Sequence, residues 1–178
     1  MKKIILPYLT LLTFITSILY AGALDFASTP DVEWSIRIGV KKGKEKDTYN
    51  FFGISTNASA KYDAKDLPKP PPISNEQLSL YFPHKDWGTN PDNYAADFRP
   101  PPGDKETFDF IVHTGIPESR GRLFWSNIRE VPGKYRVMLI DVLSNDTVNM
   151  RLKKSYAFKS DEKGKREFKV VVVRKGNK

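Results

Sequence analysis

The chain has 178 residues, with 29 lysines and arginines against 21 acids, a formal net charge of +8 and no cysteine. The absence of cysteine excludes a disulfide framework, thiol catalysis and thiolate metal sites. This length is typical of one domain whose core is large enough to fold without covalent cross-links.

The N-terminal segment has the three parts of a secretory signal peptide. A basic start, a mainly apolar run over residues 4–19 and small residues at 21–23 follow one another. The run is interrupted by proline and hydroxyl residues and is shorter than the roughly 20 residues of a transmembrane helix. We expect residues 1–23 to be cleaved, residues 24–178 to form a single β-sandwich domain, and the mature protein to be secreted, periplasmic or at the cell surface, without stable membrane insertion.

Short runs that alternate apolar and polar residues predict strands along the mature chain, and helical patterns are nearly absent. In chain order the predicted strands are residues 34–40, 78–82 and 108–112, a strand marked by Leu123 and Trp125, and residues 135–140 and 147–152, the last two joined by a turn at 144–146. Their number and spacing favour an all-β fold, namely a two-sheet antiparallel β-sandwich of immunoglobulin-like, Greek-key type.

The last two predicted strands, residues 156–158 and 168–173, are interpreted as a closing hairpin in which Gly164 supplies a positive φ. Residues 151–178 carry eleven lysines or arginines against three acids. Such a segment attracts anionic surfaces such as lipopolysaccharide, teichoic acid or nucleic acid. We favour solvated lysines that protect strand edges, because nucleic-acid binding needs basic and aromatic residues interleaved on one strand face. No nucleic-acid partner is therefore expected.

Two long stretches, residues 61–77 and 83–104, lack strand alternation and are predicted to be surface loops. The first contains a proline-rich run from Pro68 to Pro72. Because proline is stiff and cannot donate to a β-ladder, we expect this run to form a strap across a sheet edge. The alternative, a ligand for a proline-recognising domain, is less favoured because such domains are mainly intracellular.

Aromatic residues in and before the second loop mark a candidate ligand site. Trp87 and Tyr94 are the main candidates, with Tyr81, His84 and Asp86 beside them. A flat ring stacks on the apolar face of a sugar while polar neighbours bind its hydroxyl groups. The alternative, which we favour, is that the rings pack beneath the loop, because aromatic residues dominate core burial.

Three charged residues are predicted to form a structural loop clamp. Asp97 and Arg99 are spaced to share one strand face, and Asp141 ends a predicted strand. Ion pairs between carboxylates and arginine would hold the loops in place. The alternative is that these residues contact a ligand.

No catalytic constellation stands out. His84 and His113 are the only histidines, and no Gly-x-Ser-x-Gly motif is present. A zinc site needs three or four suitably spaced ligands, and the possible calcium ligands match no known loop, so no metal site and no cofactor is predicted. A hydrolase would need two acids, such as Asp86 and Asp97, to converge in a cleft.

Several motifs follow one another in a specific order. They are Tyr49 to Ile54, Tyr62-Asp63, Asp66 to Pro71, Leu78 to His84 with Trp87, Tyr94 to Pro100, Leu123 to Trp125, and Tyr135 to Asp141. This order resembles an uncharacterised β-sandwich module of secreted bacterial surface proteins, often found next to immunoglobulin-like and type IX secretion sorting domains. The resemblance implies the fold and an extracellular context, and it carries no known catalytic residue. Because we recognise no sorting domain within these 178 residues, we do not carry over the expectation of surface attachment.

We therefore expect a non-catalytic module that acts by surface contact, in adhesion, assembly or scaffolding, with a protein or glycan of the cell envelope or extracellular matrix as partner. The first alternative is a carbohydrate-binding module that uses the loop aromatics. The second is a carboxylate-dependent hydrolase.

Overall fold

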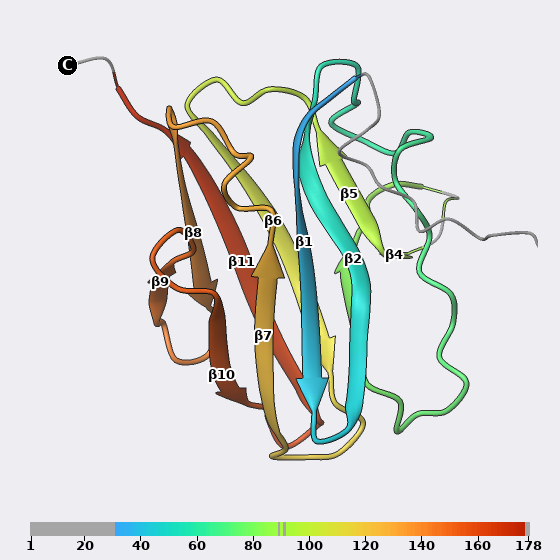
Figure 1. The fold of residues 1–178 in the computed structure, drawn as a ribbon. Helices are drawn as coiled ribbons and strands as arrows, with labels where there is room; N and C mark the ends of the chain where they lie inside the picture. The colour runs from blue at the N-terminus through green and yellow to red at the C-terminus, as the bar shows by residue number, and fades with distance from the viewer. Residues whose placement is uncertain (1–30, 89, 91, 177–178) are drawn as a thin grey trace, which may run out of the picture.

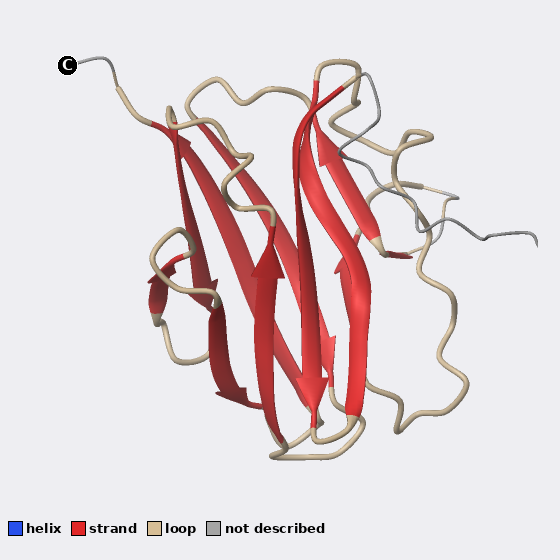
Figure 2. Cartoon of the chain, viewed as in Figure 1, coloured by secondary structure: helices blue, strands red, loops and turns tan. Residues whose placement is uncertain are grey.

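The computed structural model describes residues 31–176 except 89 and 91. The predicted signal peptide lies outside the described residues. Strands and loops make up the whole of the described chain, as Figure 2 shows, and this part contains no helix long and apolar enough to cross a membrane.

The described residues form eleven strands in two sheets that pack face to face (Figure 1). The strands are β1 (Val32–Lys42), β2 (Glu45–Ser55), β3 (Ser79–Pro83), β4 (Asn93–Tyr94), β5 (Ala96–Arg99), β6 (Lys105–His113), β7 (Arg120–Ser126), β8 (Tyr135–Asp141), β9 (Thr147–Asn149), β10 (Ser155–Lys159) and β11 (Lys165–Arg174). One sheet has the order β10-β7-β1-β2-β5 and the other β4-β3-β6-β11-β8-β9. The predicted all-β, two-sheet sandwich is confirmed.

Alternating side chains from both sheets form the main core. On β1, Trp34, Ile36, Ile38 and Val40 point inward and are at most 2 % exposed, as expected for a strand with one buried face. From the opposite sheet, Phe110 of β6 stacks on Phe168 of β11 with ring centroids 5.2 Å apart, and other aromatic rings fill the space between. Because aromatic side chains bury large apolar areas, this layer contributes much of the apolar burial that stabilises the fold.

The closing hairpin predicted from the sequence is wrong. β10 pairs with β7 in one sheet, whereas β11 lies between β6 and β8 in the other. The turn itself is tight: Gly164 has φ 71° and its N–H donates to the Asp161 carbonyl at 3.1 Å. The strands then separate, because the rings of Phe158 and Phe168 meet across the core with centroids 5.3 Å apart.

Three strands, β2, β4 and β5, were not predicted, and the prediction of a surface loop over residues 83–104 is wrong at β4 and β5, where residues 94–98 are buried. β2 is buried on both faces near its end, since Phe52 faces the main core while Phe51 packs with Ala96 and Phe98 in a second, smaller core. A strand covered on both faces shows no polar alternation. β5 pairs with β2 in parallel, so the antiparallel expectation is wrong for this one pair.

The proline-rich run begins as a strap along a sheet edge. The Lys69 N–H donates to the Asn93 carbonyl at 2.9 Å, the Ala95 N–H donates to the Leu67 carbonyl at 2.7 Å, and Pro68 forms a bridge to Tyr94. The Lys69 ammonium then donates to Asp47 of β2 at 2.6 Å. In Figure 1 the green loop that contains this strap runs beside β4 on the right of the sandwich.

Candidate functional site

The buried carboxylate of Asp97 is the centre of a group of side chains that we call the loop cluster. Its members are Asp66, His84, Trp87, Tyr94, Asp97 and Arg99. Asp97 is 0 % exposed, and Arg99 donates to its two oxygens from Nε at 2.6 Å and from Nη2 at 3.1 Å. The His84 Nε2 atom lies 2.9 Å from Asp97 Oδ2, and Arg99 also donates to the Ala60 carbonyl at 3.1 Å. Burial lowers the pKa of Arg99, but the hydrogen bond and charge of Asp97 outweigh it and raise this pKa. The arrangement ties the loop after β2 and the end of β3 to β5.

The predicted ligand aromatics pack around this clamp. The His84 ring stacks on Trp87 with centroids 3.7 Å apart and planes 2° apart, and Tyr94 meets Trp87 edge-on at 4.8 Å. The Arg99 guanidinium lies 5.5 Å from the Trp87 ring centroid, and Tyr62 packs at 6.2 Å. Because Trp87 is 5 % exposed and Tyr94 is 0 % exposed, neither offers a ring face to a sugar, and they pack beneath the loop.

Asp86 does not form a catalytic acid pair with Asp97. Its carboxylate lies 3.9 Å from His84 Nδ1, with the side chain 78 % exposed, so the imidazole stands between an exposed and a buried carboxylate. A glycoside hydrolase needs its two carboxylates on either side of the substrate bond. Here the imidazole of His84 occupies that position. Within the described ranges, no group of three or more His, Asp or Glu residues is placed to hold a metal ion.

Asp66 joins the cluster although the sequence analysis gave it no chemical role. It is 2 % exposed and accepts hydrogen bonds from the N–H groups of Phe98, at 3.0 Å, and Asp63, at 2.9 Å. Burial raises the pKa of Asp66 to about 6, with smaller contributions from the charges of Asp97 and Asp63, and the two hydrogen bonds oppose this rise. The carboxylate holds the loop before the strap against β5.

We expect Asp66 to make the fold more stable as the pH falls from about 6 towards 3.8. In this window the folded state binds a proton that the unfolded state releases, so the ionised form costs the fold on the order of 3 kcal/mol above pH 6. Asp66→Asn cannot ionise. The free energy of unfolding of wild type relative to Asp66→Asn, measured in urea, should therefore decrease between about pH 4 and about pH 7. A difference that is constant with pH would contradict the raised pKa.

Asp141 lies apart from Asp97 and Arg99, at the end of β8. Its Oδ1 atom is 2.8 Å from Arg166 Nε, and its Oδ2 atom accepts from Arg166 Nη2 at 2.9 Å and from the Tyr156 hydroxyl at 3.0 Å. It also accepts from the Leu143 N–H at 3.2 Å. These contacts fix the turn between β8 and β9, and they connect it to β10 and β11.

The outer face of the five-stranded sheet carries a row of like charges. Lys41 of β1 lies directly opposite Lys46 of β2 on one side and Arg122 of β7 on the other. All three are exposed, and none forms an ion pair within the described part of the chain. Residues directly opposite in antiparallel strands have Cβ atoms about 5 Å apart, and like charges there destabilise the sheet. We call Lys41, Lys46 and Arg122 the cation row.

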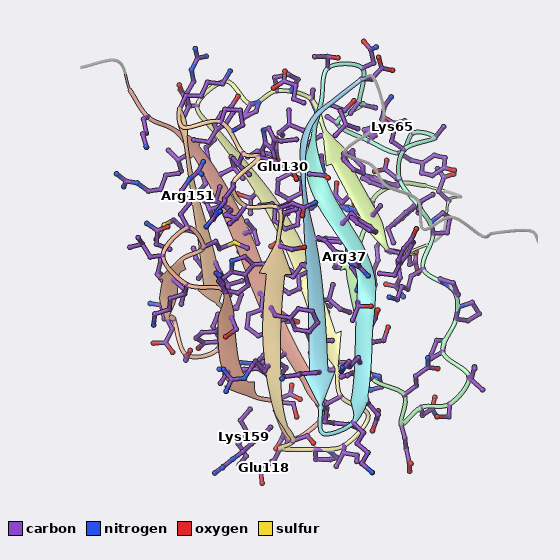
Figure 3. The ribbon with its side chains drawn as sticks, in the orientation of Figure 1. Arg37, Lys65, Glu118, Glu130, Arg151 and Lys159 are labelled. Carbon is purple, nitrogen blue, oxygen red and sulfur yellow. The ribbon has the colours of Figure 1, made fainter. Side chains whose placement is uncertain are left out.

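Two adjoining recesses extend from the cation row. One, of about 730 Å³, is lined by Lys41, Gly43, Arg120, Gly121, Arg122, Ser144, Asp146, Tyr156, Ala157, Phe158, Lys159 and Arg166. The other, of about 440 Å³, shares Lys41 and Arg122 with the first and is also lined by Lys46 and Phe124. Asp146 is the acid of the larger recess and accepts hydrogen bonds from the hydroxyls of Tyr156, at 2.8 Å, and Ser144, at 2.9 Å. Figure 3 shows Lys159 beside Glu118 at the lower end of the molecule, where they form an ion pair at 2.8 Å.

Comparison with known proteins gave no match among protein-family models, curated proteins or solved structures. The chemistry of the site must therefore be derived from its own residues.

The cation row was missed because it depends on the register of three strands. A signal was present for one pair: Gly43 has φ 58° in a tight turn, and a hairpin centred there places Lys41 opposite Lys46. Nothing in the sequence places Arg122 beside them, because it lies on β7, about eighty residues further along the chain. The predicted basic C-terminal segment contributes Lys159 and Arg166 to the larger recess.

Proposed function

We propose that this chain is a non-catalytic module that acts by surface contact with an anionic polymer of the cell envelope or extracellular matrix. The observation that carries the proposal is the cation row, in which Lys41 faces both Lys46 and Arg122 and none of the three forms an ion pair with a described residue. Such a row costs stability in the free protein and becomes favourable when negative charge lies over it.

The shape of the surface supports an extended partner. The two recesses are open and adjoin each other along β2, β1, β7 and β10, so a chain with repeated charges can contact cations on successive strands about 5 Å apart. The basic start and apolar run of the N-terminal segment, together with the resemblance to a module of secreted surface proteins, support a location outside the cytoplasm.

The non-catalytic part of the proposal rests on the polar groups of the loop cluster. Both oxygens of Asp97 are bound by Arg99 and His84, and Asp66 accepts two backbone hydrogen bonds. Carboxylates that are buried and hydrogen-bonded in this way stabilise loops and have no open path to a substrate. This favours surface contact over the hydrolase alternative.

Nucleic acid is the competing polyanion. Arg120, Arg122 and Phe124 lie on the outer face of β7, which is an interleaving of basic and aromatic residues. However, the Phe124 ring lies over Gly39, where a Cβ atom would come within 2.7 Å of it. A ring packed on the sheet in this way is poorly placed to stack on a base, so we favour an anionic glycan.

We expect Lys41→Gln to weaken binding to an anionic polysaccharide at least tenfold while making the fold more stable by about 0.5 kcal/mol. The two effects have one cause, because the substitution removes the central charge of the cation row. Binding is measured by calorimetry at about 50 mM and about 200 mM salt, and it should weaken steeply with salt. Stability is measured by urea unfolding at low salt.

Lys169→Gln is the matched control, because Lys169 is an exposed lysine on the other sheet and is paired with Asp109 at 3.3 Å. It should change neither binding nor stability appreciably. Polymer binding that is equal in Lys41→Gln and wild type would overturn the proposed surface. Tighter binding to single-stranded DNA than to the polysaccharide would overturn the proposed class of partner.

A further inference from the structure

A third recess lies under the proline-rich strap, on the outer face of the six-stranded sheet. Its volume is about 320 Å³, and it is lined by Lys69, Pro70, Pro71, Pro72, Asn75, Ser79, Tyr81, Asn93, His113 and Lys165. None of these residues lines the two recesses beside the cation row. The volume is at the lower end of the range for small-ligand sites, roughly 300 to 1,000 Å³.

The floor of this strap recess is set by strand register. Ser79 of β3 lies opposite His113 of β6, which lies opposite Lys165 of β11, so the three side chains form one row across the outer face of the sheet. Tyr81 stands two residues along β3 from Ser79, on the same face. The floor is therefore rigid, because each of its residues belongs to a paired strand.

The wall of the recess is held in place before any ligand binds. Lys69 is fixed at the start of the strap by its backbone bond to Asn93 and by hydrogen bonds from its ammonium to Asp47, at 2.6 Å, and Asn50, at 2.7 Å. The three prolines that follow have restricted φ angles, so little conformational entropy remains to be lost on binding. At the far end, the Ile73 N–H donates to Gln77 Oε1 at 2.6 Å and closes the loop that carries Asn75.

The lining combines an aromatic ring, amides and one exposed cation, Lys165. Tyr81 and the prolines supply apolar surface, and two asparagines and a serine supply hydrogen-bonding groups. No acid lines the recess, and Lys165, an exposed residue, forms no ion pair with any described residue, whereas the ammonium of Lys69 is engaged by Asp47. Burial, followed by the charges of Lys165 and Lys42, lowers the pKa of His113, so at pH 7 its neutral ring offers one donor and one acceptor.

We propose that the strap recess binds one acidic sugar residue, with the sugar ring against Tyr81 and the carboxylate on Lys165. An aromatic face matches the apolar face of a pyranose, and side-chain amides bind its hydroxyls. No acid lines the recess, so a carboxylate beside Lys165 meets a cation first, although the charge of Glu167, in the next row of the sheet, reaches Tyr81 and raises its pKa. Among the predicted ligand aromatics, Tyr81 lines this recess, whereas Trp87 and Tyr94 are buried beneath the loop.

The test is a calorimetric titration of the chain with a short oligogalacturonate and with an uncharged oligosaccharide of the same length. We expect the acidic oligomer to bind more tightly than the neutral one. Lys165→Gln and Tyr81→Ala should each weaken its binding at least tenfold. Lys169→Gln is the matched control, because Lys169 lies on the same face of β11 outside the recess, and it should leave binding within about twofold of wild type.

Lys41→Gln separates this proposal from the proposed function, because it removes the centre of the cation row and leaves the strap recess intact. Loss of oligogalacturonate binding in Lys41→Gln but not in Lys165→Gln would place the sugar at the cation row and overturn the strap recess. Equal affinity for the neutral oligomer, or binding of neither, would also overturn it. If Tyr81→Ala does not fold, as judged by near-ultraviolet circular dichroism, Lys165→Gln decides, because Lys165 is exposed.

Discussion

Replacing Asp97 by Asn is expected to lower the free energy of unfolding by about 3 to 5 kcal/mol. The substitution keeps the shape of the side chain and removes its charge. The Arg99 side chain is only 15 % exposed and would then remain buried beside Trp87 without a counter-charge, while His84 would lose its carboxylate partner. Removing one partner of a buried ion pair costs far more than the pair contributes, because the other charge stays desolvated.

Urea unfolding at neutral pH measures this loss, and Asp109→Asn is the matched control. Asp109 also pairs with a cation, Lys169 at 3.3 Å, but its side chain is 53 % exposed, so its loss should cost less than about 0.5 kcal/mol. The double variant Asp97→Asn/Arg99→Gln should recover part of the stability, since it removes the unpaired, buried charge of Arg99. Equal effects of Asp97→Asn and Asp109→Asn would show that the clamp does not hold the loops.

Strands with one solvent face were predictable and strands without one were not. β8 alternates buried residues with exposed or half-buried ones, because one face meets the core and the other meets water. On β1 apolar residues alternate with polar residues or glycine along the sequence, although Ser35 and Gly39 are themselves buried. β2 ends in six consecutive buried residues, since the second core around Phe98 covers its outer face. Its sequence therefore has no alternation to detect, and the parallel partner β5 is too short to show any.

The turn at Gly164 was predicted correctly, but the pairing of the two strands on either side of it was not. Gly164 takes the positive φ that its sequence context predicts. Whether the flanking strands pair or separate depends on where Phe158 and Phe168 find their partners, and each enters the core from a different sheet. Tertiary packing therefore decides which sheet each strand joins, and no pattern in the neighbouring sequence indicates it.

The same limit applies to the loop cluster. The Asp97–Arg99 pair follows from a spacing of two residues on one strand. His84 and Asp66 join it from segments 13 and about 30 residues away, through contacts that exist only after the loops fold over β5. The cation row likewise requires the register of β7 against β1, which the sequence does not contain.

Gly53→Ala is expected to cost about 3 kcal/mol or more, because its new methyl group would meet backbone. Gly53 lies on β2 between β1 and β5, paired with Ser35 on one side and Phe98 on the other. A Cβ atom there would come within 2.3 Å of the Trp34 carbonyl oxygen and 3.0 Å of the Phe98 ring. Strand backbone cannot swing aside like a side chain, so β1 and β2 must separate locally and break ladder hydrogen bonds.

Two other glycines make the cause testable by urea unfolding. At Gly39 the methyl group would meet the Phe124 ring at 2.7 Å and the Asp47 carbonyl oxygen at 3.1 Å. The half-buried ring can shift slightly while it stays packed on the sheet, so Gly39→Ala should cost about 1 kcal/mol. At Gly133 nothing lies within 4 Å, so Gly133→Ala should be neutral or slightly stabilising, because alanine restricts the unfolded chain. The predicted order of loss is therefore Gly53, then Gly39, then Gly133. If Gly39→Ala costs as much as Gly53→Ala, contact with backbone is not the reason that the Gly53 substitution is costly.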